Sequence, residues 1–145
     1  MKISTRGRYG LRALVDLALY EEGKAIPLRK ISERENISEQ YLEQLFASLR
    51  KAGIVSSVRG AHGGYLLNED PDEITAGDVI RVLEGPIQPV SCVTDDFECE
   101  QEKECVTHDL WLLLSDQIGE VLDSYTLSDL VQKAGKIKYD SEKND

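Results

Sequence analysis

Two short helical patterns joined by a tight turn, with a glycine-rich hairpin pattern directly after them, constrain the fold of this chain most. Residues 27–36 and 38–53 each place apolar side chains at three- and four-residue spacing, which is typical of amphipathic helices. Asn36 can adopt the left-handed conformation that ends a helix, and Ser38 is a good cap for the next one. The pair predicts a helix-turn-helix. The buried stripe of its second helix is expected to consist of Tyr41, Leu42, Leu45, Phe46 and Leu49.

The residues after this pair are typical of two short strands. Residues 54–58 and 65–67 are β-prone, and residues 59–64 between them hold three glycines together with Arg59 and His62. A hairpin with a glycine-rich, cationic tip is the wing of a winged helix-turn-helix. The expected fold class is therefore mainly α with a small β wing.

Further helices are expected on both sides of this unit. Residues 5–22 have helical periodicity, and residues 75–85 form a capped helix. A longer amphipathic helix covers about residues 106–123, and a short helix capped by Thr126 follows it. The polar tail from Lys136 is expected to be disordered.

The outer face of the second helix of the pair carries the candidate base-reading residues. In a helix-turn-helix, the N-terminal part of this helix enters the major groove. Glutamine, serine and glutamate can bond base edges, and the glutamates also repel phosphate, which disfavours poor sequences. The same residues would suit an ordinary solvated face, but the wing that follows favours DNA binding. The candidates are Ser38, Glu39, Gln40, Glu43 and Gln44.

Basic residues and glycines supply candidate contacts to the DNA backbone. Arg59 suits a narrow minor groove, where negative potential is concentrated, and His62 suits a phosphate. Gly60, Gly63 and Gly64 would let the backbone approach a duplex without side-chain bulk. Further phosphate candidates, each of which could instead be an ordinary surface charge, are Lys2, Arg6, Arg8, Arg50 and Lys51.

Charge is divided unevenly along the chain. The whole sequence has 17 Lys and Arg against 27 Asp and Glu, a net charge of −10, which argues against nucleic acid. Residues 1–66, however, hold 11 basic and 7 acidic residues, whereas residues 67–145 hold 6 and 20. A basic N-terminal part can be attracted to phosphates while the acidic part is held away from them.

All three cysteines, followed by a histidine, lie in one short polar segment. Soft thiolates with one imidazole suit zinc, or an iron–sulfur cluster in which histidine replaces a thiolate. A zinc finger or ribbon would normally contain a CxxC pair, which is absent from this sequence. The wide spacing favours a cluster over a zinc ion or a bare thiol redox switch. The candidate ligands are Cys92, Cys99, Cys105 and His108.

No stretch of the sequence approaches the roughly 20 apolar residues that cross a bilayer, and residues 1–7 lack the apolar core of a signal peptide. We therefore expect a cytoplasmic protein without a membrane partner, in a reducing environment that favours metal binding over structural disulfides. The sequence also lacks a Gly-rich cofactor loop and a nucleophile–base pair, so an enzyme is not expected.

The long helix at residues 106–123 has a wide apolar band. One side of it could pack within the chain and another against a second copy. A two-fold dimer would set two winged-helix units on the half-sites of a pseudo-palindromic, double-stranded DNA operator. We expect a homodimer with Leu110, Leu114, Ile118 and Val121 at its interface.

Four motifs together resemble one family. Residues 1–10, 31–34, 37–45 and 58–67 are similar to the Rrf-type winged helix-turn-helix transcription regulators, over about residues 1–133. Within that family the chain resembles the iron–sulfur cluster regulators. The resemblance implies a dimer in which the long helices cross, and a 2Fe–2S cluster held by three cysteines and a histidine at the candidate ligand positions. The first gap between cysteines is one residue longer here, which a loop can absorb.

Single features separate two other branches of the family. The nitric-oxide-sensing members use an N-terminal aspartate as a ligand of a four-iron cluster, and Arg8 at that position counts against this cluster type. The cysteine-metabolism regulators resemble residues 1–90, including 74–78 and 83–86, but lack the set of three cysteines. The cysteine segment therefore distinguishes the cluster-sensing branch from the cysteine-metabolism branch.

The sequence thus predicts an iron–sulfur cluster-sensing DNA-binding repressor of genes for cluster biogenesis or for cysteine and sulfur metabolism. The alternatives are a zinc-stabilised or cluster-free repressor like the cysteine-metabolism regulators, and a nitric oxide or redox sensor of the same fold. The expected organisation is a winged helix-turn-helix DNA-binding domain (1–67), a linker and fourth helix (68–91), a sensor loop (92–108), dimerisation helices (106–135) and a disordered tail (136–145).

Overall fold

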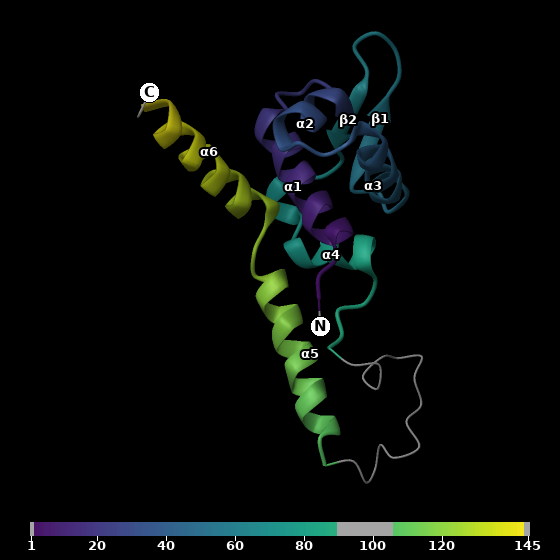
Figure 1. The fold of residues 1–145 in the computed structure, drawn as a ribbon, viewed down its shortest axis with the longest axis vertical. Coiled ribbons are helices and arrows are strands. Elements are labelled where there is room, and N and C mark those ends of the chain that lie inside the picture. The colour runs from purple at the N-terminus through teal and green to yellow at the C-terminus, as the bar shows by residue number, and fades with distance from the viewer. Residues whose placement is uncertain (1, 90–105, 144–145) are drawn as a thin grey trace.

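The computed structural model describes residues 2–89 and 106–143, in which helices surround a small hairpin (Figure 1). In chain order the elements are α1 (Thr5–Tyr20), α2 (Leu28–Glu35), α3 (Glu39–Lys51), β1 (Val55–Val58), β2 (Gly64–Leu67), the 3-10 turn η1 (Pro71–Glu73), α4 (Ala76–Glu84), α5 (His108–Asp123) and α6 (Leu127–Lys143).

The helix ends follow the capping residues in the sequence. Asn36 ends α2 with a left-handed φ of 55°. At the start of α3, the backbone N–H of Tyr41 donates to the Ser38 hydroxyl, as the sequence predicts. Thr75 and Asp78 form a reciprocal capping box on α4. The winged helix-turn-helix fold class is confirmed.

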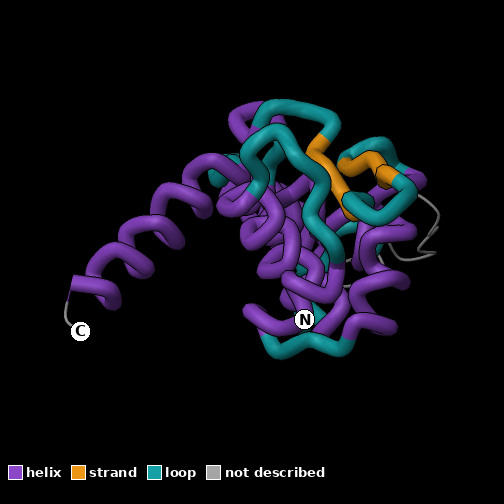
Figure 2. The backbone as a smooth tube through the Cα atoms, turned by 90° about the horizontal axis from the view of Figure 1, so that it is seen from above, coloured by secondary structure: helices purple, strands orange, loops and turns teal. Residues whose placement is uncertain are grey.

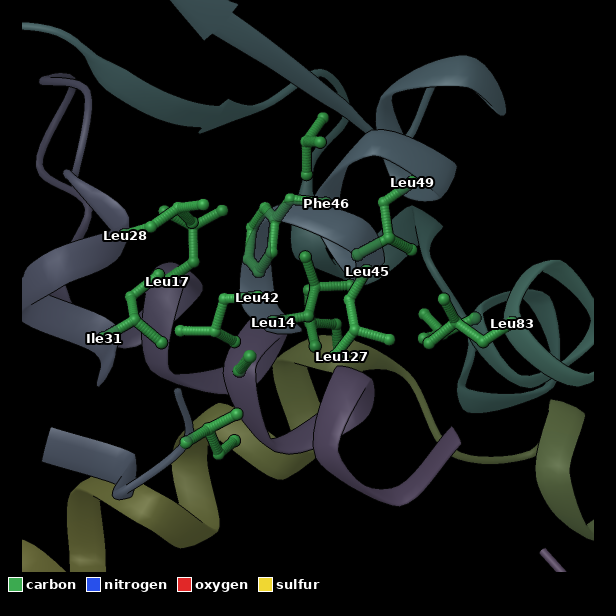
Figure 3. Packing of buried hydrophobic residues seen from close by; sticks show 14 of the residues in the cluster. Leu14, Leu17, Leu28, Ile31, Leu42, Leu45, Phe46, Leu49, Leu83 and Leu127 are labelled. Atoms are coloured by element: carbon green, nitrogen blue, oxygen red, sulfur yellow. The ribbon is translucent and has the colours of Figure 1, made fainter. Parts of the chain in front are cut away.

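One hydrophobic core joins α1, α2, α3 and α4 to the first turn of α6 (Figure 3). Fully burying one leucine contributes about 2 kcal/mol relative to leaving it exposed. Tyr41, predicted to be buried, is only half-buried, because its ring lies at the edge of the core against Tyr9. The fully buried side chains include Leu14, Leu17, Ile31, Leu42, Leu45, Phe46, Leu49, Val79 and Leu127.

The hairpin is fixed to the start of α2. Its strands pair from Val55 with Leu67 to Val58 with Gly64, and Figure 2 shows them at the edge of the helical body. Ile26 and Tyr65 exchange two backbone hydrogen bonds of 2.9 Å, which join β2 to the segment before α2. The wing is therefore held by the helix-turn-helix that precedes it.

Gly64 makes this junction possible, and replacing it is expected to damage the fold. A Cβ at Gly64 would lie 2.2 Å from the carbonyl oxygen of Ile26, and Ile26 cannot move without losing its bonds to Tyr65. Gly64→Ala should therefore destabilise the protein by about 2–3 kcal/mol. Gly60→Ala is the matched control, because its φ is also positive (111°) but its Cβ meets nothing within 4 Å. The control should cost about 1 kcal/mol in urea unfolding. Equal losses would contradict a role for the contact with Ile26.

The C-terminal end of α5 is attached to α4. Arg81 forms two hydrogen bonds of 2.8 Å with the Asp123 carboxylate, which lower the pKa of Asp123. Thr75 and Thr126 form a β-bridge beside this ion pair. From this attachment, α5 extends away from the winged helix-turn-helix (Figure 1).

Helix α6 is longer than the sequence pattern suggests. The predicted disordered tail is wrong for residues 136–143, which continue the helix to Lys143. The helix packs along α1, and Lys138 Nζ lies 4.3 Å from the centre of the Tyr20 ring. Such contacts stabilise helix in a segment that lacks an apolar stripe. Within the described residues, no helix is long and apolar enough to cross a membrane.

Candidate nucleic-acid interface and sensor segment

The predicted base-reading residues form one exposed face of α3. The opposite face is buried in the core, which fixes the orientation of the helix. The Ser38 hydroxyl accepts the N–H of Tyr41 and keeps its own proton for donation. The structure thus brings the five residues together at the N-terminal end of α3, all of them exposed: Ser38, Glu39, Gln40, Glu43 and Gln44.

The tip of the wing is exposed and projects from the helical body (Figure 1). Arg59, Gly60 and His62 all lie at this tip and are accessible to a ligand. Gly63 resembles Gly64, because its Cβ would lie 2.3 Å from the carbonyl oxygen of Val58. The hairpin itself therefore requires Gly63 and Gly64, whereas Gly60 lies in open space. Of the three glycines, Gly60 is the one suited to close approach by a duplex.

The predicted phosphate contacts are spread over several faces. Arg50 and Lys51 are exposed in the last turn of α3, where Arg50 Nη1 donates to the Ser57 hydroxyl at 3.4 Å. Arg8 is exposed but lines, with residues of α6, a groove between α1 and α6. Lys2 lies beside the end of α4. Of these four basic residues, Arg50 and Lys51 belong to α3, the helix that carries the candidate base-reading residues.

Arg6 differs from the other candidates because its guanidinium is bonded within the chain. It is half-buried, with Nε donating to the carbonyl oxygen of Leu83 at 2.9 Å and Nη2 donating to the Ser48 hydroxyl at 2.6 Å. These bonds connect α1 to the end of α4 and to α3. Nothing in the local sequence signals them, because Arg6 and Leu83 are 77 positions apart.

The first turn of α2 carries two exposed cations that sequence reasoning missed, Arg29 and Lys30. In a helix-turn-helix, the first helix crosses the phosphate backbone. The signal was their position directly after Pro27, which begins the first helix of the pair. They are additional candidates for phosphate contacts.

Of the four predicted metal ligands, the structure describes His108. Cys92, Cys99 and Cys105 lie outside the described residues. His108 begins α5 and is buried, with 8% of its surface exposed. Within residues 2–89 and 106–143, no three His, Cys, Asp or Glu side chains are placed to hold a metal ion. A site at His108 would therefore draw its other ligands from the cysteine segment.

The described residues on the two sides of the cysteine segment both lie along α5. The segment leaves α4 through residues 85–89 and returns at His108. The hydroxyl of Ser115, two turns into α5, donates to the carbonyl oxygen of Ile87 at 3.1 Å. Three thiolates and one imidazole are the donor types that a 2Fe–2S cluster or zinc requires.

Several apolar side chains of α5 are exposed to solvent in the single chain. Leu110, Leu114 and Val121 expose 54%, 39% and 57% of their surface. Ile118, also predicted at the interface, is half-buried, and Leu113, which was not predicted, is 57% exposed. Exposed apolar patches of this kind mark contacts with other chains.

Comparisons with known proteins agree with this geometry. A family model described as "Rrf2: Iron-dependent Transcriptional regulator" matches residues 3–133. The transcriptional regulator CymR of Bacillus subtilis is 51% identical over 130 residues, which cover 90% of this chain and 89% of CymR. IscR of Pectobacterium atrosepticum is 44% identical over 131 residues, which cover 90% of this chain and 79% of IscR. The structure of CymR, described as the global cysteine regulator of B. subtilis, superposes with a TM-score of 0.76 at 50% identity, covering 92% of this chain and 98% of that one.

Proposed function

This chain belongs to the Rrf2 family of transcriptional regulators, and from that premise we propose that it binds a pseudo-palindromic operator as a homodimer under the control of an iron–sulfur cluster. The family resemblance of the sequence is confirmed, and the relatives are transcriptional regulators rather than enzymes. Repression is the expected outcome when such a dimer occupies a promoter.

One observation supports DNA binding above the others: the polar residues of α3 and the cationic residues of the wing tip are all exposed, on elements that follow one another in the chain. A helix of this kind reads base edges in the major groove, while the wing reaches the backbone or the minor groove. The helix-turn-helix also carries exposed cations, Arg29 and Lys30 in the first turn of α2 and Arg50 and Lys51 in the last turn of α3.

The exposed face of α5 supports a homodimer. Leucines at positions 110, 113 and 114 would be buried if α5 packed against its counterpart in a second copy. An isologous contact between two identical helices presents two winged-helix units with two-fold symmetry, which is the symmetry of a pseudo-palindromic operator.

The donor set supports an iron–sulfur cluster. Three cysteines and the buried His108 match the ligand types of a 2Fe–2S cluster with mixed thiolate and imidazole ligation, which supplies a redox-active and oxidant-sensitive centre. His108 begins α5, so a group bound there contacts the proposed dimer helix directly. Occupancy of the site would thereby influence how the two DNA-binding units are held.

The relation to CymR favours a second candidate, a cluster-free regulator of cysteine metabolism. CymR shares 51% identity with this chain, against 44% for IscR. The cysteines would then act as thiols or bind zinc, and His108 would be only a buried polar residue at a helix start. The two candidates share a fold and differ in the contents of the cysteine segment.

Anaerobic purification distinguishes these candidates. We expect a coloured protein with about two iron and two sulfide per chain. The Cys99→Ser variant is expected to lose both while retaining the helix content of the wild type. One zinc per chain without sulfide would support the zinc-stabilised alternative. A colourless, metal-free protein after reconstitution with ferrous salt and sulfide would contradict the cluster.

A random-sequence library of duplexes tests operator binding without the choice of a target gene. Duplexes that the protein enriches from it should contain inverted repeats with half-sites about one helical turn apart. Failure to enrich any sequence, with and without the cluster, would contradict the proposed function.

The ligand at position 108 sets how firmly the cluster is held. Imidazole is protonated and lost more readily than a thiolate. His108→Cys should therefore retain its visible absorbance about tenfold longer than the wild type when air is admitted, and its reduction potential should fall. His108→Ala, which supplies no ligand, is the matched control and should lose the cluster faster. Equal lifetimes in all three proteins would mean that His108 is not a ligand.

A further inference from the structure

A polar junction joins the N-terminus of α1, the C-terminus of α4 and the reading helix α3. At its centre, Arg6 donates from Nε to the carbonyl oxygen of Leu83 at 2.9 Å and from Nη2 to the Ser48 hydroxyl at 2.6 Å. Leu83 is in the last turn of α4, and Ser48 is in the last turns of α3. One guanidinium therefore connects two helices between which the whole wing intervenes in the chain.

The α4 side of the junction is held firmly on α1. The Glu84 carboxylate accepts hydrogen bonds from the backbone N–H groups of Ser4 and Gly7, both at 2.9 Å, and from the Ser4 hydroxyl. These bonds, that of the Ser4 hydroxyl first, lower the pKa of Glu84. A Cβ on Gly7 would lie 2.6 Å from Glu84 Oε1, so the two helices approach closely. The end of α4 thus forms a fixed base for Arg6.

On the α3 side, the junction adds one side-chain hydrogen bond to the apolar packing of α3 against the core. The Ser48 hydroxyl accepts from Arg6 and lies one turn after Gln44, which belongs to the exposed reading face. The rotation of α3 about its axis decides which side chains meet the bases. The hydrogen bond from Arg6, which is itself bonded to the end of α4, therefore restrains the rotation of α3 at Ser48.

From this geometry we infer that Arg6 is a positioning residue for α3, and that it acts on DNA through Ser48 rather than by contacting a phosphate. This inference rests on the proposed DNA-binding function. The fork of the guanidinium is essential to it, because one planar group must reach two acceptors on different helices. A lysine at this position keeps the positive charge and loses the second contact.

The salt dependence of DNA binding tests the inference. The probes are a duplex enriched by the wild-type protein from a random library and a scrambled duplex of the same composition. A residue that contacts a phosphate contributes about 0.9 to the slope of log affinity against log salt, whereas a positioning residue contributes nothing. Arg6→Lys and Arg6→Gln should both weaken binding to the enriched duplex by about tenfold, with the wild-type slope. Affinity for the scrambled duplex should not change.

Lys51→Gln is the matched control, because Lys51 is an exposed cation at the end of α3. It should weaken binding to both duplexes and reduce the slope by about 0.9. A phosphate role for Arg6 would instead leave Arg6→Lys like the wild type and give Arg6→Gln the behaviour of this control. That result would overturn the inference.

A second variant keeps the test independent of the stability of the Arg6 variants. Ser48→Ala removes the acceptor without changing charge, and it should weaken specific binding severalfold. In the double variant with Arg6→Lys, Ser48→Ala should cause little further loss of affinity, since both changes break the same hydrogen bond between Arg6 and Ser48. Wild-type affinity in Ser48→Ala, or full additivity in the double variant, would refute the inference. If the wild-type protein enriches no duplex from the library, the proposed DNA-binding function fails, and not the inference about Arg6. Circular dichroism at the assay temperature shows which variants are folded.

Discussion

Replacing Leu110 and Leu114 together by glutamate is expected to convert the protein to a monomer and to weaken operator binding by about 100-fold or more. Both leucines are exposed on α5 and lie one helical turn apart. Two glutamates on this face would put like charges opposite each other across a two-fold axis and would be desolvated by association. Loss of the dimer removes the second half-site, whose binding is otherwise intramolecular.

Light scattering coupled to size-exclusion chromatography measures the mass, and a titration with a two-half-site duplex measures the affinity. Asp109→Asn with Asp116→Asn is the matched control, because it also changes two charges on α5 but leaves the leucines in place. The control should remain dimeric. A double glutamate variant of unchanged mass would place the interface elsewhere and would remove the reason given for the exposed leucines.

Arg34→Met is expected to destabilise the folded protein by about 3–5 kcal/mol. Asp16 of α1 is buried, with 3% of its side chain exposed, and the Arg34 guanidinium pairs with both of its oxygens at 2.7–3.1 Å. Removing Arg34 leaves a buried carboxylate without its counter-ion, although methionine fills similar volume. The Arg34 guanidinium also lies 3.8 Å from the centre of the Tyr20 ring, and that contact is lost too.

Urea unfolding of the wild type and the variant gives the difference directly. Arg12→Met is the matched control, because Arg12 pairs with Glu35 at 3.4 Å, with half of the Arg12 side chain exposed to solvent. An exposed pair of this kind contributes about 1 kcal/mol or less. If the two variants lose similar stability, the burial of Asp16 does not govern the energetics of this pair.

Local sequence signals were sufficient for the helix-turn-helix and the wing. Asn36 acts through its own left-handed backbone, and Ser38 and the capping box at Thr75 act through bonds to residues within four positions, so these roles can be read from the local sequence. The spacing of the apolar residues in α3 then placed the reading residues on the opposite face. These elements are determined by short stretches of the chain.

The features that sequence reasoning missed depend on distant contacts. Arg6 resembles any surface cation in the sequence, because its partner Leu83 is brought to it only by the fold, and α6 packs on α1 through distant residues such as Lys138 and Tyr20. Gly64 was assigned to the approach of DNA, whereas the structure shows a contact with the backbone of Ile26. In each case the partner lies more than 30 positions away in the sequence.

The candidate metal ligands, in contrast, could be recognised from the sequence before the fold was known. Identity over the whole chain is greater with CymR than with IscR, but metal chemistry depends on four side chains and not on the other 141 residues. The spacing of the cysteines could be recognised from the sequence. The burial of His108 at the first turn of α5 required the fold.

The ion pair between Arg81 and Asp123 attaches α5 to α4 at the C-terminal end of α5, so a tilt of this helix moves its two ends by different amounts. Its 16 residues span about 24 Å, and its C-terminal end is pinned to α4 by the ion pair and the adjacent β-bridge. If α5 tilts by about 5° about its C-terminal end, the His108 end moves by about 2 Å. Small displacements at the two ends of α5 are therefore unequal, and the larger one always occurs beside the cysteine segment.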